Sequence, residues 1–349
     1  MSLMAAHRSR FPSAPRAGLA CRPRLQRPVL RGPSRDGTLR GMPNRAAVVY
    51  SEHYQCDIGP HVFPMEKFRW VRDALIASGD LDPAEILEPA PATLAELMQV
   101  HTLEYLDDLH GLRWTPRTLD SELPLQADIV AAYKLAAGGT LLAARKALQR
   151  GFGINLGGGF HHAFADRAEG FCYINDLAVA IRVLRHEGRI RRAAVVDLDV
   201  HQGNGTTHIF AADGDVFTLS LHQEQNYPMP KQRSKLDVGL PNGIEDAAYL
   251  RLLGEALESV WAFAPEIVLY QAGADPYRDD VLGGLALTPD GLERRDRLVL
   301  EGCAERNIPA VVTLGGGYAR ERRDTANIHA TTCRTALRLA GGIAPERIS

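Results

Sequence analysis

At residues 195–201 the chain reads Val195-Val196-Asp197-Leu198-Asp199-Val200-His201. Apolar and ionisable residues alternate there with the period of a strand, and the run Ala193–Val200 is predicted to be a buried strand. Because successive side chains of a strand point to opposite faces, Asp197, Asp199 and His201 are predicted to share one face. Burying two carboxylates side by side costs free energy unless cations or hydrogen-bond donors neutralise them. The stretch therefore predicts a metal site. The alternative is a pair of acids that only reach water at a strand end, and the imidazole in register makes that interpretation the poorer one.

Outward from this strand, short runs rich in Val and Ile alternate with longer stretches that have apolar residues at helical spacing. This alternation is typical of a parallel sheet with crossover helices. The predicted strands are Ala46–Tyr50, Gly153–Leu156, Ala193–Val200, Val216–Leu221, Ile267–Gln271 and Ala310–Leu314, and the predicted helices include Leu125–Arg150, Asp176–His186, Asp246–Phe263 and Pro289–Arg306. Asp176 and Asp246 are predicted helix N-caps, and Gly188 lies just past a predicted helix end. The proline-containing segment Gln223–Asn242 is predicted to be an irregular, functional loop.

Three more predicted strand ends carry polar groups. Asp275 follows one strand, His161 and His162 follow a run of three glycines after another, and Tyr318 follows a second glycine run. Because ligands bind beyond the carboxyl ends of the strands in open parallel sheets, these groups are predicted to meet. Taken singly, each has an ordinary alternative: a turn aspartate, structural histidines or a phosphate-binding glycine loop. Neither glycine run shows the GxGxxG or GK[ST] pattern, which makes nucleotide binding the poorer interpretation. Together the groups fit a hydrolytic centre with a metal, a base and an oxyanion donor.

The composition is that of a globular protein, since 45% of the 349 residues are hydrophobic and 23% are charged. No uninterrupted apolar run approaches the roughly eighteen residues of a membrane span, so no membrane partner is predicted. The five cysteines are odd in number and lack CxxC spacing. This usage argues against a disulfide framework or a cysteine zinc site, and it favours a cytoplasmic location.

Residues 1–44 differ from the rest of the chain. Nine arginines and Asp36 give residues 1–41 a formal charge of +8, which leaves −10 for the remainder of a chain whose net charge is −2. An acidic body is a poor candidate for binding phosphates, so no nucleic-acid partner is predicted. The arginine- and proline-rich tail is predicted to be disordered, or to be an artefact of an upstream start site with Met42 as the true beginning. A targeting peptide is the less favoured alternative.

The motifs resemble, in family order, those of the histone deacetylase and arginase-like superfamily over nearly all of residues 45–340, and most closely those of class IV histone deacetylases. They are Gly159-Phe160-His161-His162, Gly170-Phe171-Cys172, Asn175-Asp176, Asp197-Leu198-Asp199-Val200-His201-Gln202-Gly203-Asn204-Gly205, Gly273-Ala274-Asp275 and Gly315-Gly316-Gly317-Tyr318. The resemblance implies a single-domain α/β fold at residues 45–345, an open parallel sheet of about eight strands sandwiched by helices. It also implies a zinc-dependent deacylase that removes acetyl or longer acyl groups from lysine side chains in proteins or peptides.

By this resemblance, one Zn²⁺ per chain would be held by Asp199, His201 and Asp275. Asp197 would lie behind these ligands and accept a hydrogen bond from His161. A structural K⁺ is also implied beside the zinc.

The resemblance assigns the proton transfer to His162, as general base on the metal-activated water and then as acid to the leaving amine. Tyr318 would donate to the substrate carbonyl as its oxygen becomes an oxyanion. Asn204 departs from the commonest family pattern, an aspartate, and matches the class IV form. Because a neutral amide cannot stabilise an imidazolium as a carboxylate does, His162 is predicted to be less basic than in relatives with the aspartate.

The remaining implied contacts concern the substrate and the monovalent ion. Phe171 would form one wall of the tunnel for the alkyl chain and Tyr227 the facing wall, with Gly170 and Gly316 as further substrate-binding positions. The K⁺ would lie near Asp197, Ser220 and Leu221.

Three alternatives stay open. One is an amidohydrolase that acts on acetylpolyamines or other small acylated amines. A second is an arginase-like enzyme with two manganese ions, which is disfavoured because Gln202 and Asn204 occupy positions where extra ligands would be needed. A third is a metal-containing protein that binds acyl-lysine without turnover, which is disfavoured because the chain keeps both histidines and the tyrosine. The sequence predicts no oligomeric state.

Overall fold

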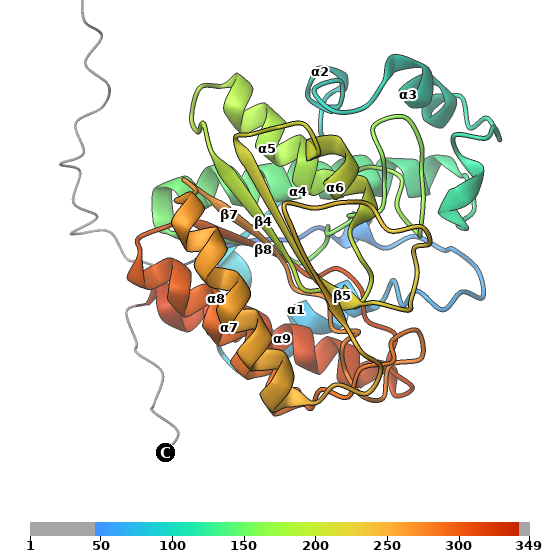
Figure 1. Cartoon of the computed structure of the whole chain (residues 1–349). Coiled ribbons are helices and arrows are strands. Elements are labelled where there is room, and N and C mark those ends of the chain that lie inside the picture. The colour runs from blue at the N-terminus through green and yellow to red at the C-terminus, as the bar shows by residue number, and fades with distance from the viewer. Residues whose placement is uncertain (1–45, 342–349) are drawn as a thin grey trace, which may run out of the picture. The chain divides into compact units, whose positions relative to one another are not determined.

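The described part of the chain, residues 46–341 of a computed structural model, contains one parallel sheet. The sheet has eight strands in the order β2-β1-β3-β8-β7-β4-β5-β6, and every neighbouring pair is parallel (Figure 1). The strands are β1 (Ala47–Val49), β2 (Ile86–Leu87), β3 (Phe152–Asn155), β4 (Ala193–Asp197), β5 (Val216–Gln223), β6 (Leu236–Leu240), β7 (Val268–Gln271) and β8 (Ala310–Thr313). This arrangement confirms the predicted α/β fold class.

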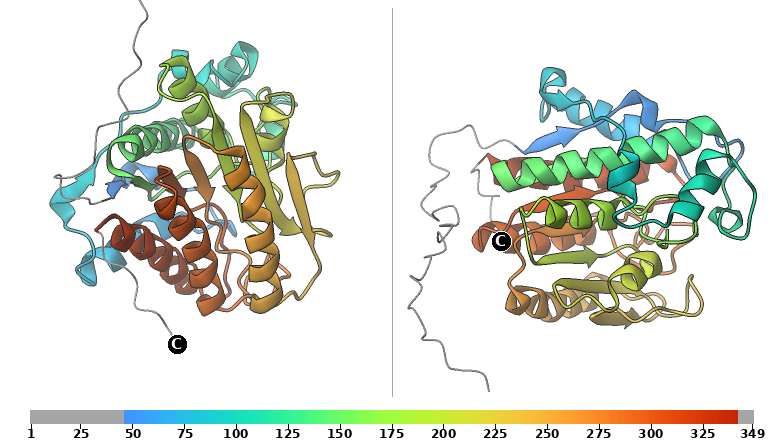
Figure 2. Two further views of the ribbon diagram at one scale, coloured as in Figure 1. Left: turned by 60° about the vertical axis from the view of Figure 1, so that its left-hand side comes forward. Right: turned by 90° about the horizontal axis from the view of Figure 1, so that it is seen from above.

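Helices cover both faces of the sheet. Helices α4, α5 and α6 pack together on one face, and α1, α7, α8 and α9 pack together on the other (Figures 1 and 2). The helices are α1 (Lys67–Ala77), α2 (Leu94–Leu97), α3 (Leu103–His110), α4 (Ala127–Arg150), α5 (Asp176–His186), α6 (Asn204–Phe210), α7 (Asp246–Phe263), α8 (Pro289–Glu305) and α9 (Arg322–Ala340). Because both faces are covered, the central strands are buried along their whole length, as their nearly continuous Val, Ile and Leu content requires.

All six strands predicted from the sequence are present, but the strand that carries the acids ends early. β4 stops at Asp197 and not at Val200, because two backbone N–H groups beyond it donate to carboxylates. The N–H of Asp199 donates to Asp197 Oδ1 at 3.2 Å, and that of Val200 donates to Asp275 Oδ1 at 2.8 Å. Asp199 and His201 therefore lie on a turn, and strand alternation does not place them.

Two strands were not predicted, and both lie at sheet edges. β2 has only two residues, and β6 lies inside the segment Gln223–Asn242 that was predicted to be an irregular loop. Only Leu240 of β6 is fully buried. Short, half-exposed edge strands carry little of the apolar pattern from which strands are predicted.

The helix predictions are close, with one error in the caps. α5 and α7 have the predicted bounds, and Gly188 follows α5 with a left-handed φ of +67°. The predicted N-caps are each one residue late, because Asn175 caps α5 with its side chain and Glu245 occupies the N-cap position of α7. Asp176 and Asp246 are the first helical residues, and their carboxylates bind other segments of the chain.

The four central strands end level with one another. In the register of the sheet, Asn155 lies opposite Thr313, Thr313 opposite Gln271, and Gln271 opposite Asp197. The loops that leave β3, β8, β7 and β4 therefore begin at one edge of the sheet, and the predicted metal ligands, His161, His162 and Tyr318 lie within seven residues of these strand ends.

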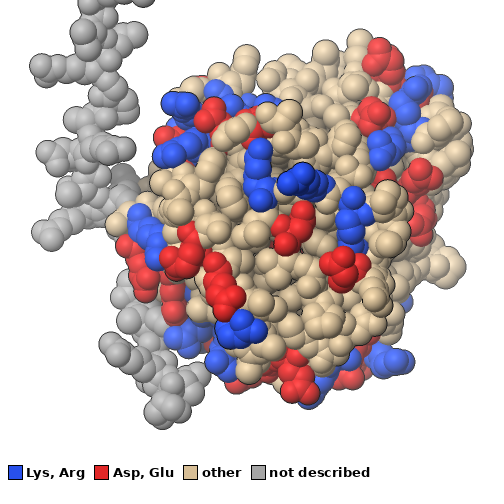
Figure 3. Space-filling view, in the orientation of Figure 1, with Lys and Arg blue, Asp and Glu red and all other residues tan. Residues whose placement is uncertain are grey.

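Two sequence-based exclusions concern membranes and nucleic acid. Among residues 46–341, one helix, α4, has the length and composition of a membrane span, but 72% of its most apolar window is buried inside the fold, which makes this weak evidence. The face shown in Figure 3 carries basic and acidic side chains interspersed, without a continuous basic patch on that face. The tail at residues 1–44 lies outside the described residues, as do residue 45 and residues 342–345 of the predicted domain 45–345.

Because α4 packs closely on the sheet, adding one methyl group at Gly153 is predicted to destabilise the fold. A Cβ at Gly153 on β3 would lie 2.1 Å from the backbone oxygen of Ala143 on α4. We expect Gly153→Ala to lower the free energy of unfolding by about 1–3 kcal/mol, measured by chemical denaturation, because helix and strand must separate. Gly254→Ala on α7, where nothing lies within 4 Å of the added Cβ, is the control and should be neutral or stabilising by about 0.5–1 kcal/mol. Equal losses in both variants would contradict this account.

Candidate active site

The loops after β4 and β7 bring Asp199, His201 and Asp275 together. Their ligand atoms lie within 4.8 Å of one another, and all three residues are buried. His201 Nδ1 lies 3.2 Å from Asp199 Oδ1 and 3.3 Å from Asp275 Oδ2. This is the only such group among the described residues, and it contains the three predicted zinc ligands and no other residue.

The group has the chemistry of a cation site. Asp275 Oδ2 is buried and has no hydrogen-bond partner, which leaves one carboxylate oxygen free for a metal. Burial, together with the neighbouring Asp199 carboxylate, raises the pKa of Asp275 to about 7. Two carboxylate oxygens and one imidazole nitrogen form a donor set that suits Zn²⁺ with an open position. The residues therefore fit the implied metal.

Backbone groups and one buried arginine fix these carboxylates. The Gly316 N–H donates to Asp199 Oδ2 at 2.8 Å. A Cβ on Gly316 would lie 2.1 Å from Asp275 Oδ2, so only glycine fits at this position. Arg295, fully buried on α8 and paired with Asp296, donates to the carbonyl of Gly273 at 2.6 Å. The arginine thus holds the loop that leads from β7 to Asp275.

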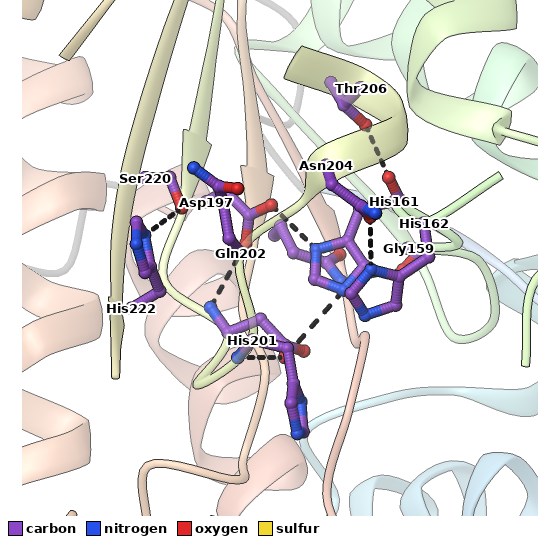
Figure 4. Close-up of polar contacts among 12 residues, drawn as sticks. Gly159, His161, His162, Asp197, His201, Gln202, Asn204, Thr206, Ser220 and His222 are labelled. Atoms are coloured by element: carbon purple, nitrogen blue, oxygen red, sulfur yellow. Dashed lines mark hydrogen bonds and ion pairs between the residues drawn. The ribbon is translucent and has the colours of Figure 1, made fainter. Parts of the chain in front are cut away.

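His161 and His162 lie side by side, with ring centroids 4.1 Å apart, but their Nδ1 atoms have different partners. His161 Nδ1 lies 2.7 Å from Asp197 Oδ2, and His162 Nδ1 lies 2.7 Å from Asn204 Oδ1 (Figure 4). Burial lowers the pKa of both rings, but the Asp197 carboxylate raises that of His161 to about 9. For His162, burial and the neighbouring His161 hold the pKa well below its usual value. The pKa of His161 is therefore raised above the usual value for histidine, whereas the pKa of the adjacent His162 is lowered below it.

A turn of glycines presents this histidine pair, and Asp176 holds the turn. The Asp176 carboxylate accepts hydrogen bonds from the N–H groups of Gly159 at 2.9 Å and Phe160 at 2.8 Å, and from the hydroxyl of Thr140 at 2.5 Å. The Asp176 side chain, which was predicted to cap a helix, thus organises the segment that carries His161 and His162. Asn175 caps α5 instead, and its side chain also donates to the Ala163 carbonyl at 3.0 Å.

A cavity of about 200 Å³ leads to these groups. It is lined by Glu122, His162, Gly170, Phe171, His201, Asn226, Tyr227, Leu282 and Tyr318. The predicted tunnel walls Phe171 and Tyr227 both line it, and so does Gly170. Gly170 has a left-handed φ of +52°, and a Cβ added to it would lie 2.7 Å from the His162 ring, so the position requires glycine. Gly316 does not line this cavity, and it lines a smaller chamber of about 20 Å³ together with His161 and Asp199.

Tyr318 lies in the loop after β8, next to the Asp199-His201-Asp275 group. Its ring centroid lies 6.4 Å from that of His201 and 6.1 Å from that of Phe171. Its backbone N–H donates to Asp280 Oδ2 at 2.6 Å, which fixes the residue next to the cavity. A phenol hydroxyl is thereby available in a site that also holds two imidazoles.

Three charged residues of the site were not predicted. Glu122 lines the cavity with a left-handed φ of +62°. Glu169 accepts hydrogen bonds from Asn204 and Tyr227. Lys67 is fully buried, donates from Nζ to the Gly315 carbonyl at 2.5 Å and has its pKa lowered by burial to about 8. No local pattern marks these residues, although Glu169 directly precedes the Gly170-Phe171 motif.

The residues predicted to hold potassium lie on two neighbouring strands. Asp197 is opposite Ser220 in the register of β4 and β5, and Leu221 follows. Both Asp197 carboxylate oxygens have protein partners, and Ser220 Oγ lies 3.0 Å from His222 Nδ1. Backbone carbonyls would have to supply most of the ligands to such an ion.

Comparison with known proteins gives one consistent result. A family model described as a histone deacetylase domain matches residues 61–334. The chain is 42% identical over 292 residues to an uncharacterised protein of Picosynechococcus, covering 83% of this chain and 97% of that one. It is 34% identical over 292 residues to histone deacetylase 2 of Arabidopsis thaliana, covering 79% and 76%.

Solved structures agree with the sequence relatives. A histone deacetylase homologue from Aquifex aeolicus aligns with a TM-score of 0.73 at 29% identity, covering 84% of each chain. A histone deacetylase homologue in complex with SAHA aligns with a TM-score of 0.72 at 27% identity, covering 87% of this chain and 92% of that one. Since the family model spans most of the chain and the fold and the buried Asp-His-Asp group agree with it, this chain belongs to the histone deacetylase family, whose members are metal-dependent hydrolytic deacetylases.

Proposed function

We propose that the chain is a zinc-dependent deacylase that hydrolyses acyl-lysine in proteins or peptides. The observation that carries the proposal is a buried Asp199-His201-Asp275 group beside two imidazoles and a phenol at the end of a narrow cavity. When bound, zinc supplies Lewis-acid chemistry, because it polarises the substrate carbonyl and acidifies a water molecule. The three residues of the group would hold it, one ion per chain.

His162 moves the proton in this proposal. With Nδ1 bound to Asn204, Nε2 is the free ring nitrogen of a residue that lines the cavity. Since burial keeps the imidazole neutral, it accepts a proton from the attacking water and then donates it to the departing amine. His161 is the second imidazole of the site, and the Asp197 carboxylate 2.7 Å from its Nδ1 favours its charged form by raising its pKa.

Tyr318 and the cavity walls act on the substrate. The Tyr318 hydroxyl donates to the carbonyl oxygen as negative charge develops there. Phe171 and Tyr227 flank the alkyl chain and exclude water from it, while the Gly170 carbonyl accepts from the substrate N–H. The neutral partner of His162, Asn204, supports assignment to the class IV type. A structural K⁺ near Asp197, Ser220 and Leu221 is part of the same proposal.

A small acylated polyamine is the second candidate substrate. Glu122 places a carboxylate among the cavity residues, and a carboxylate there favours a substrate with a further ammonium group. The same carboxylate also suits the backbone N–H of a peptide. The two substrate classes therefore have to be separated by measured rates.

A hydrolysis panel tests the function directly. We expect turnover of an acetyl-lysine peptide and a myristoyl-lysine peptide to exceed that of acetylspermidine in kcat/KM, measured by mass spectrometry of the products. His162→Ala should lower kcat by about a hundredfold or more, because it removes the base. If none of the three substrates is turned over by the zinc-loaded chain, the alternative of a binding protein without turnover is supported.

Metal content separates the proposal from a two-manganese enzyme. We expect elemental analysis to find one zinc per chain, and Asp275→Asn to reduce zinc affinity by more than about a hundredfold, since even outer partners of metal ligands cost about tenfold to a hundredfold. Asp279→Asn, an exposed acid on the same loop, is the control and should retain the metal. Two manganese ions per chain would contradict the single-zinc proposal.

The pH dependence of the rate reports on His162. The base works only when neutral, so the rate rises with pH through the pKa of His162. Asn204→Asp adds a negative charge 2.7 Å from the ring and raises that pKa, so the rising limb of kcat/KM should move to higher pH. An unmoved limb in the variant would show that the pKa of another group controls it.

A further inference from the structure

We infer that Glu169 is a positioning residue that fixes the orientation of the Asn204 amide and thereby the tautomer of His162. The inference rests on the proposed function, because it concerns the base of that reaction. It assigns a part to a carboxylate that neither touches the substrate nor belongs to the metal group.

Three side chains form a continuous hydrogen-bonded line. Asn204 Nδ2 donates to Glu169 Oε1 at 2.5 Å, and Asn204 Oδ1 lies 2.7 Å from His162 Nδ1. Asn204 is only 2% exposed, so water does not replace either contact. The amide therefore lies between a carboxylate and an imidazole.

The chemistry of the three groups allows one arrangement only. A carboxylate accepts and does not donate, so the NH₂ end of the Asn204 amide must face Glu169. The oxygen end then faces His162, and it can only accept, so the proton of the neutral ring must be on Nδ1. Nε2 keeps its lone pair toward the cavity, as a general base requires.

Without the Glu169 carboxylate, the Asn204 amide can rotate by 180° and exchange the positions of its oxygen and its NH₂ group. An Asn204 that presented its NH₂ end to His162 would favour the ring with its proton on Nε2, which has no lone pair for the attacking water. An aspartate at this position would not have that failure, because both of its oxygens accept. Asparagine therefore needs an orienting partner that aspartate does not need.

Glu169 is itself held in place. Its Oε1 also accepts from the Tyr227 hydroxyl at 3.1 Å, and Arg167 lies 3.5 Å from Oε2. Its backbone N–H donates to the Cys172 carbonyl at 3.1 Å, and its side chain is 19% exposed. A negative charge fixed in this way also polarises the amide, which strengthens the bond from Asn204 Oδ1 to the ring.

The first measurement needs no turnover. In the full chain labelled with ¹⁵N-histidine, we expect the neutral His162 ring to carry its proton on Nδ1, and Glu169→Leu to shift it to Nε2. The signal is identified among the twelve histidines by its absence from His162→Gln. Glu169→Gln, which keeps an acceptor oxygen, should retain the Nδ1 tautomer. A Glu169→Leu chain with the tautomer unchanged would overturn the inference, whatever the enzyme's activity.

The second measurement is a double-mutant cycle on kcat. Glu169→Leu should lower kcat about tenfold or more with KM within about twofold, and Glu169→Gln should lower it less. In the Asn204→Asp background, Glu169→Leu should cause a much smaller loss of kcat, because an aspartate needs no orientation and only the bond to Tyr227 is lost. Asp166→Asn, an exposed acid on the same loop, should leave kcat unchanged. Equal losses in both backgrounds would mean that Glu169 acts only on the fold. An inactive wild-type chain would instead refute the proposed function.

Discussion

The structure depends on the burial of two carboxylates, Asp199 and Asp275, at the end of a parallel sheet. Neither is exposed to water, and their oxygens lie within 3.3 Å of the single imidazole of His201. Such a pair is destabilising unless donors and a cation compensate it. The backbone N–H groups of Val200 and Gly316 supply donors, and the unpartnered oxygen of Asp275 is left for the cation.

This constraint explains the irregular backbone around the site. A Cβ at Gly273 would lie 2.4 Å from Asp199 Oδ2, and one at Gly316 would lie 2.1 Å from Asp275 Oδ2. Glycine at both positions lets the main chain approach the carboxylates closely, and at Gly316 the backbone N–H donates to Asp199 Oδ2. The loops after β7 and β8 thus have glycine where the main chain lies against a carboxylate. The ends of β3, β8, β7 and β4 are aligned in the sheet, which places these loops next to one another.

The sequence predicts the fold and the convergence of Asp199, His201 and Asp275 because both leave a local signal. Apolar runs ending in glycine, aspartate or histidine mark four strand ends, and parallel strands have to place those ends together. Three features were missed: the early end of β4 at Asp197, the edge strand β6 and the N-cap Asn175. Each depends on a hydrogen bond to a distant segment or on exposure at a sheet edge. Lys67, Glu122 and Glu169 were missed for the same reason, since a single charge in a loop has no period and its meaning lies in its partners.

The histidine pair shows why partners decide more than residue type. His161 and His162 share a turn and similar burial, yet a carboxylate raises the pKa of the first, whereas the second, with an amide partner, stays neutral. An amide brings less charge than a carboxylate, but it also has two unlike ends, so its orientation has to be set from outside. The carboxylate of Glu169 can set it, and Glu169 immediately precedes Gly170 and Phe171, which line the cavity. In the proposed reaction, this short turn forms a wall for the substrate, bonds Tyr227 on the facing wall and orients the base, His162. Because Tyr227 and Asn204 share one carboxylate, we expect a change at Tyr227 to affect, through Glu169, the position of the proton on His162.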